Sequence, residues 1–171
     1  LNDLTREVAT ITEPRWKDQS QKKGIQIELI KNLGDVLPIV GNPSELREVL
    51  TNILFNAVDA MPEGGKITIS TELHSEGWVE MRISDTGVGM TEEVRKKIFD
   101  PFFTTKGMTN SGLGMSVSYG IIKRHGGEVL VESEPGKGTT FILHLPMGYG
   151  EEVKEIEKIV IDKTKVYTLQ E

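Results

Sequence analysis

The chain has 171 residues, of which 37% are hydrophobic and 27% charged, and its formal net charge at pH 7 is −6. This composition is typical of one globular domain with a hydrophobic core, and the absence of cysteine excludes disulfides and thiolate metal sites. The sequence contains no block of basic residues, which argues against nucleic acid as the main partner. No apolar run approaches the ~20 residues of a membrane span.

The first half of the chain contains the clearest helix signal. Residues 1 to about 23 are predicted to be an amphipathic helix with a kink at Pro14, and strands are predicted at 25–31 and 37–40. Asn42 followed by Pro43 predicts the capped start of a second helix. Apolar residues at 46, 49, 50, 53, 54, 57 and 58 give that helix a continuous apolar stripe.

The second half alternates hairpins with shorter helices. Strands at 66–74 and 78–85 form one predicted hairpin, and strands at 128–133 and 139–146 form another. Helices are predicted at 91–99 and 113–125, with an irregular stretch at 100–112 between them. Hairpins mixed with helices predict an α+β sandwich in which one sheet is covered by helices on one face.

Two asparagines interrupt the helix that carries the apolar stripe. Asn52 and Asn56 lie one turn apart on its flank, although asparagine is a mediocre helix former. A carboxamide oxygen is a suitable Mg²⁺ ligand where phosphates and water complete the shell. Taken alone, a pair of solvated surface asparagines is the more common arrangement.

Three further motifs are weak when each is taken alone. ISDTGVGM (83–90) presents Asp85, whose carboxylate can accept a hydrogen bond from a heterocyclic amine, but Asp-x-Gly is also ordinary turn chemistry. SGLGMS (111–116) places glycines before a helix, where backbone N–H groups bind anions. FDPFFTTKG (99–107) places Lys106 shortly before that helix, either to contact a phosphate or within an ordinary surface loop.

In this order and spacing, the motifs resemble the N box, first glycine box, phenylalanine box and second glycine box of sensor histidine kinases. GKGTTF (136–141) resembles the last motif of the same domain, so the resemblance covers about residues 22–147. It implies the Bergerat-type fold: a two-layer sandwich of a mixed, mostly antiparallel sheet covered on one face by three helices. The spellings DAM and FFTTK resemble the nitrogen-regulation subgroup, which has a short lid.

The resemblance implies a site for ATP and Mg²⁺. Asn56 would be the metal ligand, and Asn52 would support it or touch phosphate and act with Lys106 in catalysis. Asp85 would accept from the adenine amine, and either Thr139 or Thr140 would reach adenine through water. The other nucleotide-binding residues implied are those of the pocket, Gly87, Gly89, Met90 and Ile98, and those of the lid, Thr104, Thr105, Lys106, Ser111, Gly112, Leu113 and Gly114.

One position departs from the family pattern. Many sensor kinases carry a lysine three residues after the metal-binding asparagine, and this chain has Asp59 there. A positive charge that would neutralise phosphate is therefore missing from the helix. Lys106 or Mg²⁺ is expected to supply it instead.

The resemblance also implies partners that the chain does not contain. The γ-phosphoryl group would pass to a histidine on a separate dimerisation domain, and then to a response regulator. His74, His125 and His144 do not stand in an acceptor setting. Residues 1–21 would be the end of the dimerisation helix or a linker, residues 22–147 the catalytic domain, and residues 148–171 an extension without an assigned role. The expected location is cytoplasmic, without membrane contact by this fragment, although the full-length protein could carry a membrane anchor.

Two other functions are consistent with the same motifs. An ATP-hydrolysing relative would need a glutamate one turn before the metal asparagine, but that position is Asn52, and Glu48 lies two turns away. A non-catalytic nucleotide-binding module is the second alternative, because Asp59 departs from the kinase pattern.

Overall fold

The structure is a computed structural model that describes residues 1–18, 24–75, 77–105 and 111–148. It contains a five-stranded sheet in the order β1-β2-β3-β5-β4. The strands are β1 (Ile27–Leu33), β2 (Gly65–Ser75), β3 (Trp78–Asp85), β4 (Glu128–Glu134) and β5 (Gly138–Pro146). Strands β1 and β2 pair in parallel and the other pairs are antiparallel, which confirms the predicted mixed sheet.

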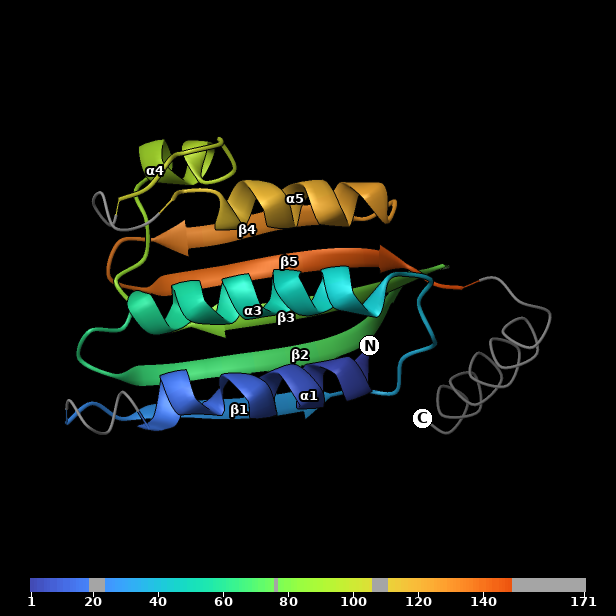
Figure 1. Ribbon diagram of the computed structural model, residues 1–171, viewed down its shortest axis with the longest axis horizontal. Helices are drawn as coiled ribbons and strands as arrows, with labels where there is room; N and C mark the ends of the chain where they lie inside the picture. The colour runs from blue at the N-terminus through green and yellow to red at the C-terminus, as the bar shows by residue number, and fades with distance from the viewer. Residues whose placement is uncertain (19–23, 76, 106–110, 149–171) are drawn as a thin grey trace, which may run out of the picture.

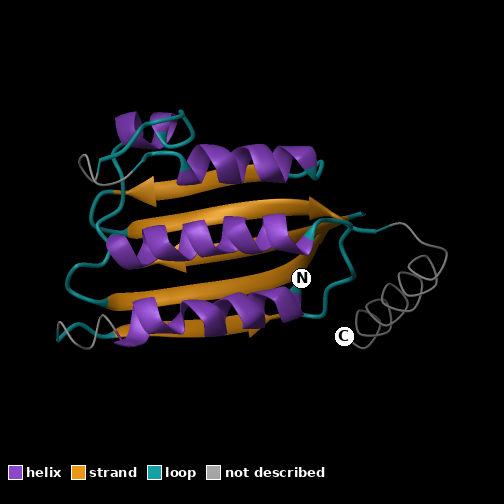
Figure 2. Ribbon diagram, in the orientation of Figure 1, coloured by secondary structure: helices purple, strands orange, loops and turns teal. Residues whose placement is uncertain are grey.

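Three helical segments cover one face of this sheet (Figures 1 and 2). They are α1 (Asn2–Glu13), which continues into the π-helical turn η1 (Pro14–Asp18), α3 (Pro43–Asp59) and α5 (Gly114–Arg124). The short helix α4 (Glu92–Lys97) lies near β4 at one edge. The predicted two-layer α+β sandwich is therefore confirmed.

The core lies between the sheet and the helices. Alternate residues of the strands point toward the helices, because side chains alternate between the two faces of a sheet. The predicted apolar stripe of α3 packs onto them. The side chains that are exposed by no more than 2% include Val49, Ile53, Leu54, Ile67, Ile69, Met81, Ile83 and Leu143.

The start of α3 follows its local sequence. The side-chain Oδ1 of Asn42 accepts hydrogen bonds from the backbone N–H groups of Ser44 at 2.9 Å and Glu45 at 3.4 Å. Pro43 occupies the first helical position, where the missing N–H costs no hydrogen bond. This cap fixes where the helix begins, and burial of its apolar stripe fixes the direction in which its asparagines point.

Residues 1–18 belong to the same packing unit as the rest of the domain. The side chain of Val8 is 1% exposed within the shared core, and Glu7 in α1 forms an ion pair with Arg47 in α3 at 2.9 Å. The boundary predicted after residue 21 therefore does not mark a change of packing unit. That residues 1–21 end a dimerisation helix or form a linker stays a prediction.

The strand predicted at 37–40 is wrong. The structure has only an isolated bridge there, between Ile39 and Met147. Pro38 has no N–H to donate to a ladder, and its carbonyl accepts from the N–H of Gly148 at 2.9 Å. Packing explains two of its apolar residues, since Leu37 is buried against Val79 and Met147 and Ile39 packs against them, whereas Val40 is 69% exposed. In the part of the chain that the structure describes, no helix has the length and apolarity to span a membrane.

Candidate functional site

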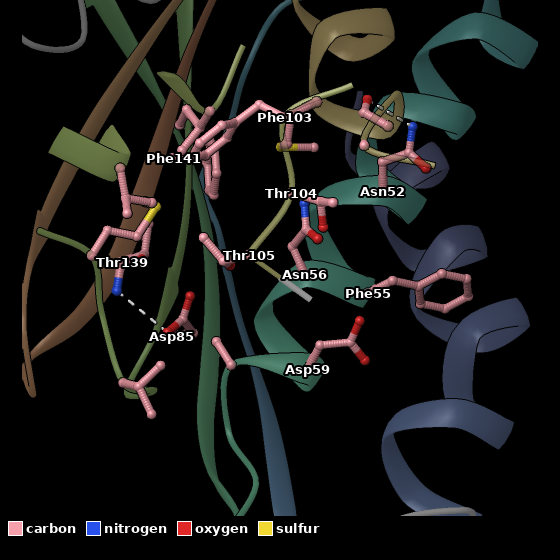
Figure 3. A pocket seen from close by; sticks show the side chains of 18 of the residues that line it. Asn52, Phe55, Asn56, Asp59, Asp85, Phe103, Thr104, Thr105, Thr139 and Phe141 are labelled. Carbon is pink, nitrogen blue, oxygen red and sulfur yellow. Dashed lines mark hydrogen bonds between the residues drawn. The ribbon is translucent and has the colours of Figure 1, made fainter. Parts of the chain in front are cut away.

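A cavity of about 420 Å³ opens between α3, the ends of β3 and β5, and the loops before α4 and α5 (Figure 3). This volume is in the range of small-molecule sites in proteins. Most of the residues predicted from the motifs line it, together with several that were not predicted. The lining residues are Arg15, Asn52, Phe55, Asn56, Asp59, Ala60, Asp85, Val88, Gly89, Met90, Val94, Ile98, Phe103, Thr104, Thr105, Ser111, Gly112, Gly114, Met115, Thr139 and Phe141.

Asp85 ends β3 at the wall of this cavity. Its side chain is nearly buried, and its Oδ1 accepts from the backbone N–H groups of Gly87 at 2.8 Å and Thr139 at 3.3 Å. Burial raises the pKa of the Asp85 carboxyl above its ordinary value, while these two hydrogen bonds act in the opposite direction. The bonds hold the Asp85 carboxylate, a hydrogen-bond acceptor, in a fixed orientation at the cavity wall.

The glycines after Asp85 allow close approach of backbone segments. Gly89 has φ +65°, and a Cβ there would lie 2.0 Å from the carbonyl oxygen of Glu134. A Cβ at Gly87 would lie 2.5 Å from the carbonyl oxygen of Ala60, and Gly87 does not itself line the cavity. Gly87 therefore contributes through packing and its N–H to Asp85, whereas Met90 and Ile98 line the cavity as expected.

Asn52 and Asn56 lie on the face of α3 that borders the cavity (Figure 3). Both are half-buried, so they are not a solvated surface pair. The Nδ2 of Asn52 donates to the carbonyl oxygen of Gly114 and to the Oγ of Ser118, each at 3.2 Å. Asn52 therefore ties α3 to the first turn of α5, and Asn56 borders the cavity one turn further along α3.

The first turn of α5 and the loop before it complete the cavity wall. Ser111, Gly112 and Gly114 line it, as do Thr104 and Thr105. Leu113 does not, although it was predicted to bind nucleotide. Lys106 lies outside the described residues.

The structure distinguishes the two threonines that the sequence left as alternatives. Thr139 lines the cavity, and its N–H donates to Asp85. Thr140 is the next residue of β5 and points to the other side of the sheet, where its Oγ1 lies 2.9 Å from the Oγ of Ser84. The prediction that included Thr140 is therefore corrected, because its side chain does not line this cavity.

Arg15 borders the cavity although no motif indicated it. Its Nη2 lies 2.8 Å from Asp59 Oδ1, and its guanidinium lies 4.3 Å from the centre of the Phe55 ring. It is the one cationic side chain among the described residues that line the cavity. The contact joins η1 to the end of α3, so no local sequence pattern could have signalled it. The apolar lining residues Val88, Val94, Phe103, Met115 and Phe141 were also not predicted.

Comparisons with known proteins agree with this arrangement. Residues 41–149 match the family described as "Histidine kinase-, DNA gyrase B-, and HSP90-like ATPase". Sporulation kinase E of Bacillus subtilis (strain 168) is 42% identical over 75% of the chain. Signal transduction histidine-protein kinase AtoS of Escherichia coli (strain K12) is 44% identical over 86% of it. The chain spans 17% of the first of these relatives and 27% of the second.

A solved structure gives the same result for the fold. The catalytic domain of histidine kinase ThkA superposes with a TM-score of 0.72 at 32% sequence identity. The match covers 85% of this chain and 91% of that one. The match therefore extends over nearly the whole of a histidine kinase catalytic domain.

Proposed function

This chain belongs to the histidine kinase-, DNA gyrase B- and HSP90-like ATPase family, and we propose that it is the catalytic domain of a two-component sensor histidine kinase. In this role it binds ATP with Mg²⁺ and transfers the γ-phosphoryl group to a histidine on a separate dimerisation domain. The observation that carries the proposal is that the N box, both glycine boxes and the threonines of the phenylalanine box line one cavity.

The two ends of the cavity fit the two ends of ATP. Asp85 accepts from the adenine amine, with Thr139 beside it and with Gly89, Met90 and Ile98 around the ring. Asn56 and the N-terminus of α5 border the part that takes the phosphates. The α5 helix contributes N–H groups and the positive end of its dipole there.

The donor set at the phosphate end fits Mg²⁺. Asn56 offers an amide oxygen, and Mg²⁺ usually keeps several waters while binding one or two protein oxygens together with substrate phosphates. When bound, the ion would neutralise phosphate charge during transfer. Asn52 contributes as a positioning residue, because its hydrogen bonds hold α5 against α3. Lys106, which lies outside the described residues, stays proposed as a cation that contacts phosphate.

Arg15 places a positive charge beside Asp59, the position at which many sensor kinases carry a lysine. We expect Arg15→Gln to weaken ATP binding roughly fivefold, about 1 kcal/mol, and to leave adenosine binding unchanged. The effect is modest because the side chains of Arg15 and Asp59 are 40% and 29% exposed, so solvent screens the charge. Calorimetric titrations of the parent and variant with ATP and with adenosine measure this change in affinity.

A second ion pair between α1 and α3 gives a matched control. Arg47 pairs with Glu7 but does not line the cavity, so Arg47→Gln should leave both affinities unchanged. Asp59→Lys, added to Arg15→Gln, restores one cation and should recover ATP binding. Equal losses from Arg15→Gln and Arg47→Gln, or an equal loss of adenosine binding, would contradict a direct role of Arg15 toward phosphate.

The chain alone is expected to bind Mg-ATP without acquiring phosphohistidine. The ring of His125 is held by the N–H of Asn42 at 2.9 Å and the carbonyl of Ile121 at 2.8 Å. His74 and His144 both contact Glu80, and none of the three histidines lines the cavity. Adding a dimeric helical domain with an exposed histidine should produce transfer, because proximity contributes several kcal/mol to such reactions.

The experiment uses labelled ATP with and without this partner, followed by acid and base treatment of the product. Acid-labile, base-stable label on the partner supports the kinase proposal. Rapid release of free phosphate without a partner would favour a hydrolase instead. The cavity gives that alternative little support, since its described lining contains Asp59 and Asp85 but not Glu48.

The proposal implies partners outside this chain. They are the dimerisation domain that carries the acceptor histidine and a downstream response regulator, and the expected location is the cytoplasm. Residues 1–21 are proposed to lead from the dimerisation domain, and residues 22–147 to be the catalytic domain. The proposed extension, residues 148–171, lies outside the described residues except for Gly148.

A further inference from the structure

Three side chains with metal-ligating atoms meet on the sheet face opposite the helices. They are His74 of β2, Glu80 of β3 and His144 of β5. Side chains alternate along β3, so Glu80 points away from the face where Met81 packs in the core. The strand register then places His144 directly opposite Glu80 on the neighbouring strand.

The distances between the three ligand atoms are close to those in a metal centre. Glu80 Oε2 lies 2.9 Å from His144 Nε2 and 3.3 Å from His74 Nδ1. No pair of the three atoms is more than 4.8 Å apart. Nitrogen and oxygen ligands about 2.0–2.2 Å from a tetrahedral Zn²⁺ lie roughly 3.3 Å from one another. The two separations that involve Glu80 Oε2 are therefore close to those expected around a tetrahedral ion.

A neighbouring charge orients the carboxylate ligand. Arg82 Nη1 binds the other carboxylate oxygen, Glu80 Oε1, at 2.9 Å, which directs Oε2 toward the imidazoles. The other ring nitrogen of His144, Nδ1, lies 4.0 Å from Glu128 Oε2. This distance is too long for a hydrogen bond, so Glu128 contributes only a nearby negative charge.

His74 is the adjustable member of the group. Leu73 pairs with Val79 and Ser75 with Trp78, so β2 has an extra residue at His74, a bulge that redirects its side chain. Its ring is stacked on that of His144, with centroids 4.3 Å apart and planes 15° from parallel. Parallel rings cannot direct two lone pairs at one ion, so His74 must turn. Its side chain is 46% exposed, which allows this.

We propose that His74, Glu80 and His144 form a binding site for a divalent first-row transition ion such as Zn²⁺, with water completing its coordination. Two imidazoles and one carboxylate suit zinc and its neighbours better than Mg²⁺. The site is separate from the nucleotide cavity, because Glu80 lies about 17 Å from Asp85 along β3 at about 3.3 Å per residue. A bound ion would join β2, β3 and β5 and stabilise the sheet.

Titration with Co²⁺ in the presence of saturating Mg²⁺ tests the site in the full chain. We expect saturable binding of one Co²⁺, with the visible absorption of a four- or five-coordinate ion, and displacement by Zn²⁺. Zn²⁺ should also raise the melting temperature. His74→Gln and His144→Gln should each weaken Co²⁺ binding by at least about 100-fold, since even outer partners of metal ligands contribute 10–100-fold. His74→Gln should leave the fold intact because His74 is half exposed.

Glu132→Gln is the matched control. Glu132 lies on the same face and pairs with Arg82 at 3.1 Å, but it contributes no ligand atom to the group. Its substitution should leave Co²⁺ affinity and absorption unchanged. The proposal is overturned if the parent chain shows no saturable Co²⁺ binding. It is also overturned if binding survives unchanged in His74→Gln and His144→Gln, in which case the three residues form only a hydrogen-bonded cluster.

Discussion

Asn56→Ala is expected to reduce affinity for Mg-ATP by on the order of 100-fold while leaving adenosine affinity and the melting temperature close to those of the parent. The amide oxygen is the proposed protein ligand of Mg²⁺, and removal of a direct ligand should cost at least as much as removal of an outer partner. Asn56 is half-buried at the cavity wall and is not part of the apolar core, so the fold should persist. Calorimetric titrations with ATP plus Mg²⁺, ATP plus EDTA, and adenosine separate these contributions.

Glu48→Ala is the control for this substitution. Glu48 is an exposed residue of the same helix, two turns before Asn56, and it does not line the cavity. Its replacement should change neither Mg-ATP affinity nor stability appreciably. Unaltered Mg-ATP affinity in a well-folded Asn56→Ala variant would contradict the metal-ligand role, and an equal loss of adenosine affinity would indicate a general distortion of α3.

Asp85→Asn should weaken binding of ATP, ADP and adenosine alike, by roughly 10- to 100-fold. Hydrogen bonds to charged groups contribute about 1.5–3 kcal/mol, and the carboxylate would lose this charge assistance. The amide Oδ1 can still accept from Gly87 and Thr139, but the new NH₂ group would then face the adenine amine, donor to donor. Competition titrations with the three ligands measure the loss.

Thr140→Val is the control at the adenine end. Thr140 is adjacent to Thr139 in the sequence but bonds to Ser84 on the other sheet face, so its replacement should not affect nucleotide affinity. If GTP competes as well as ATP for binding to the parent chain, Asp85 does not recognise the adenine amine. The two substitutions also test the orientation of the ligand, because Asn56→Ala should spare adenosine whereas Asp85→Asn should not.

The sequence alone determined the features that depend on interactions between residues close together in the chain. The cap at Asn42 and the apolar stripe after it predicted α3, and alternating residues with turn signals predicted both hairpins. The order of four short motifs predicted the fold and most of the cavity lining through the resemblance to sensor histidine kinases, because the residues of each motif lie within a few consecutive positions. Asn52, Asn56, Asp85 and Gly112 line the cavity as that resemblance implied, although each motif taken alone was a weak signal.

Only the tertiary structure decided the contacts between residues distant in the chain. The pairing of Arg15 with Asp59 depends on how α1 packs against α3, and the choice of Thr139 over Thr140 depends on the sheet face that each one occupies. The meeting of His74, Glu80 and His144 depends on strand order, register and a bulge. The segment 37–40 was mistaken for a strand because burial and strand pairing favour the same apolar residues. Local preferences fix which way a side chain points within its own element, but which side chain it meets follows from packing over the whole chain.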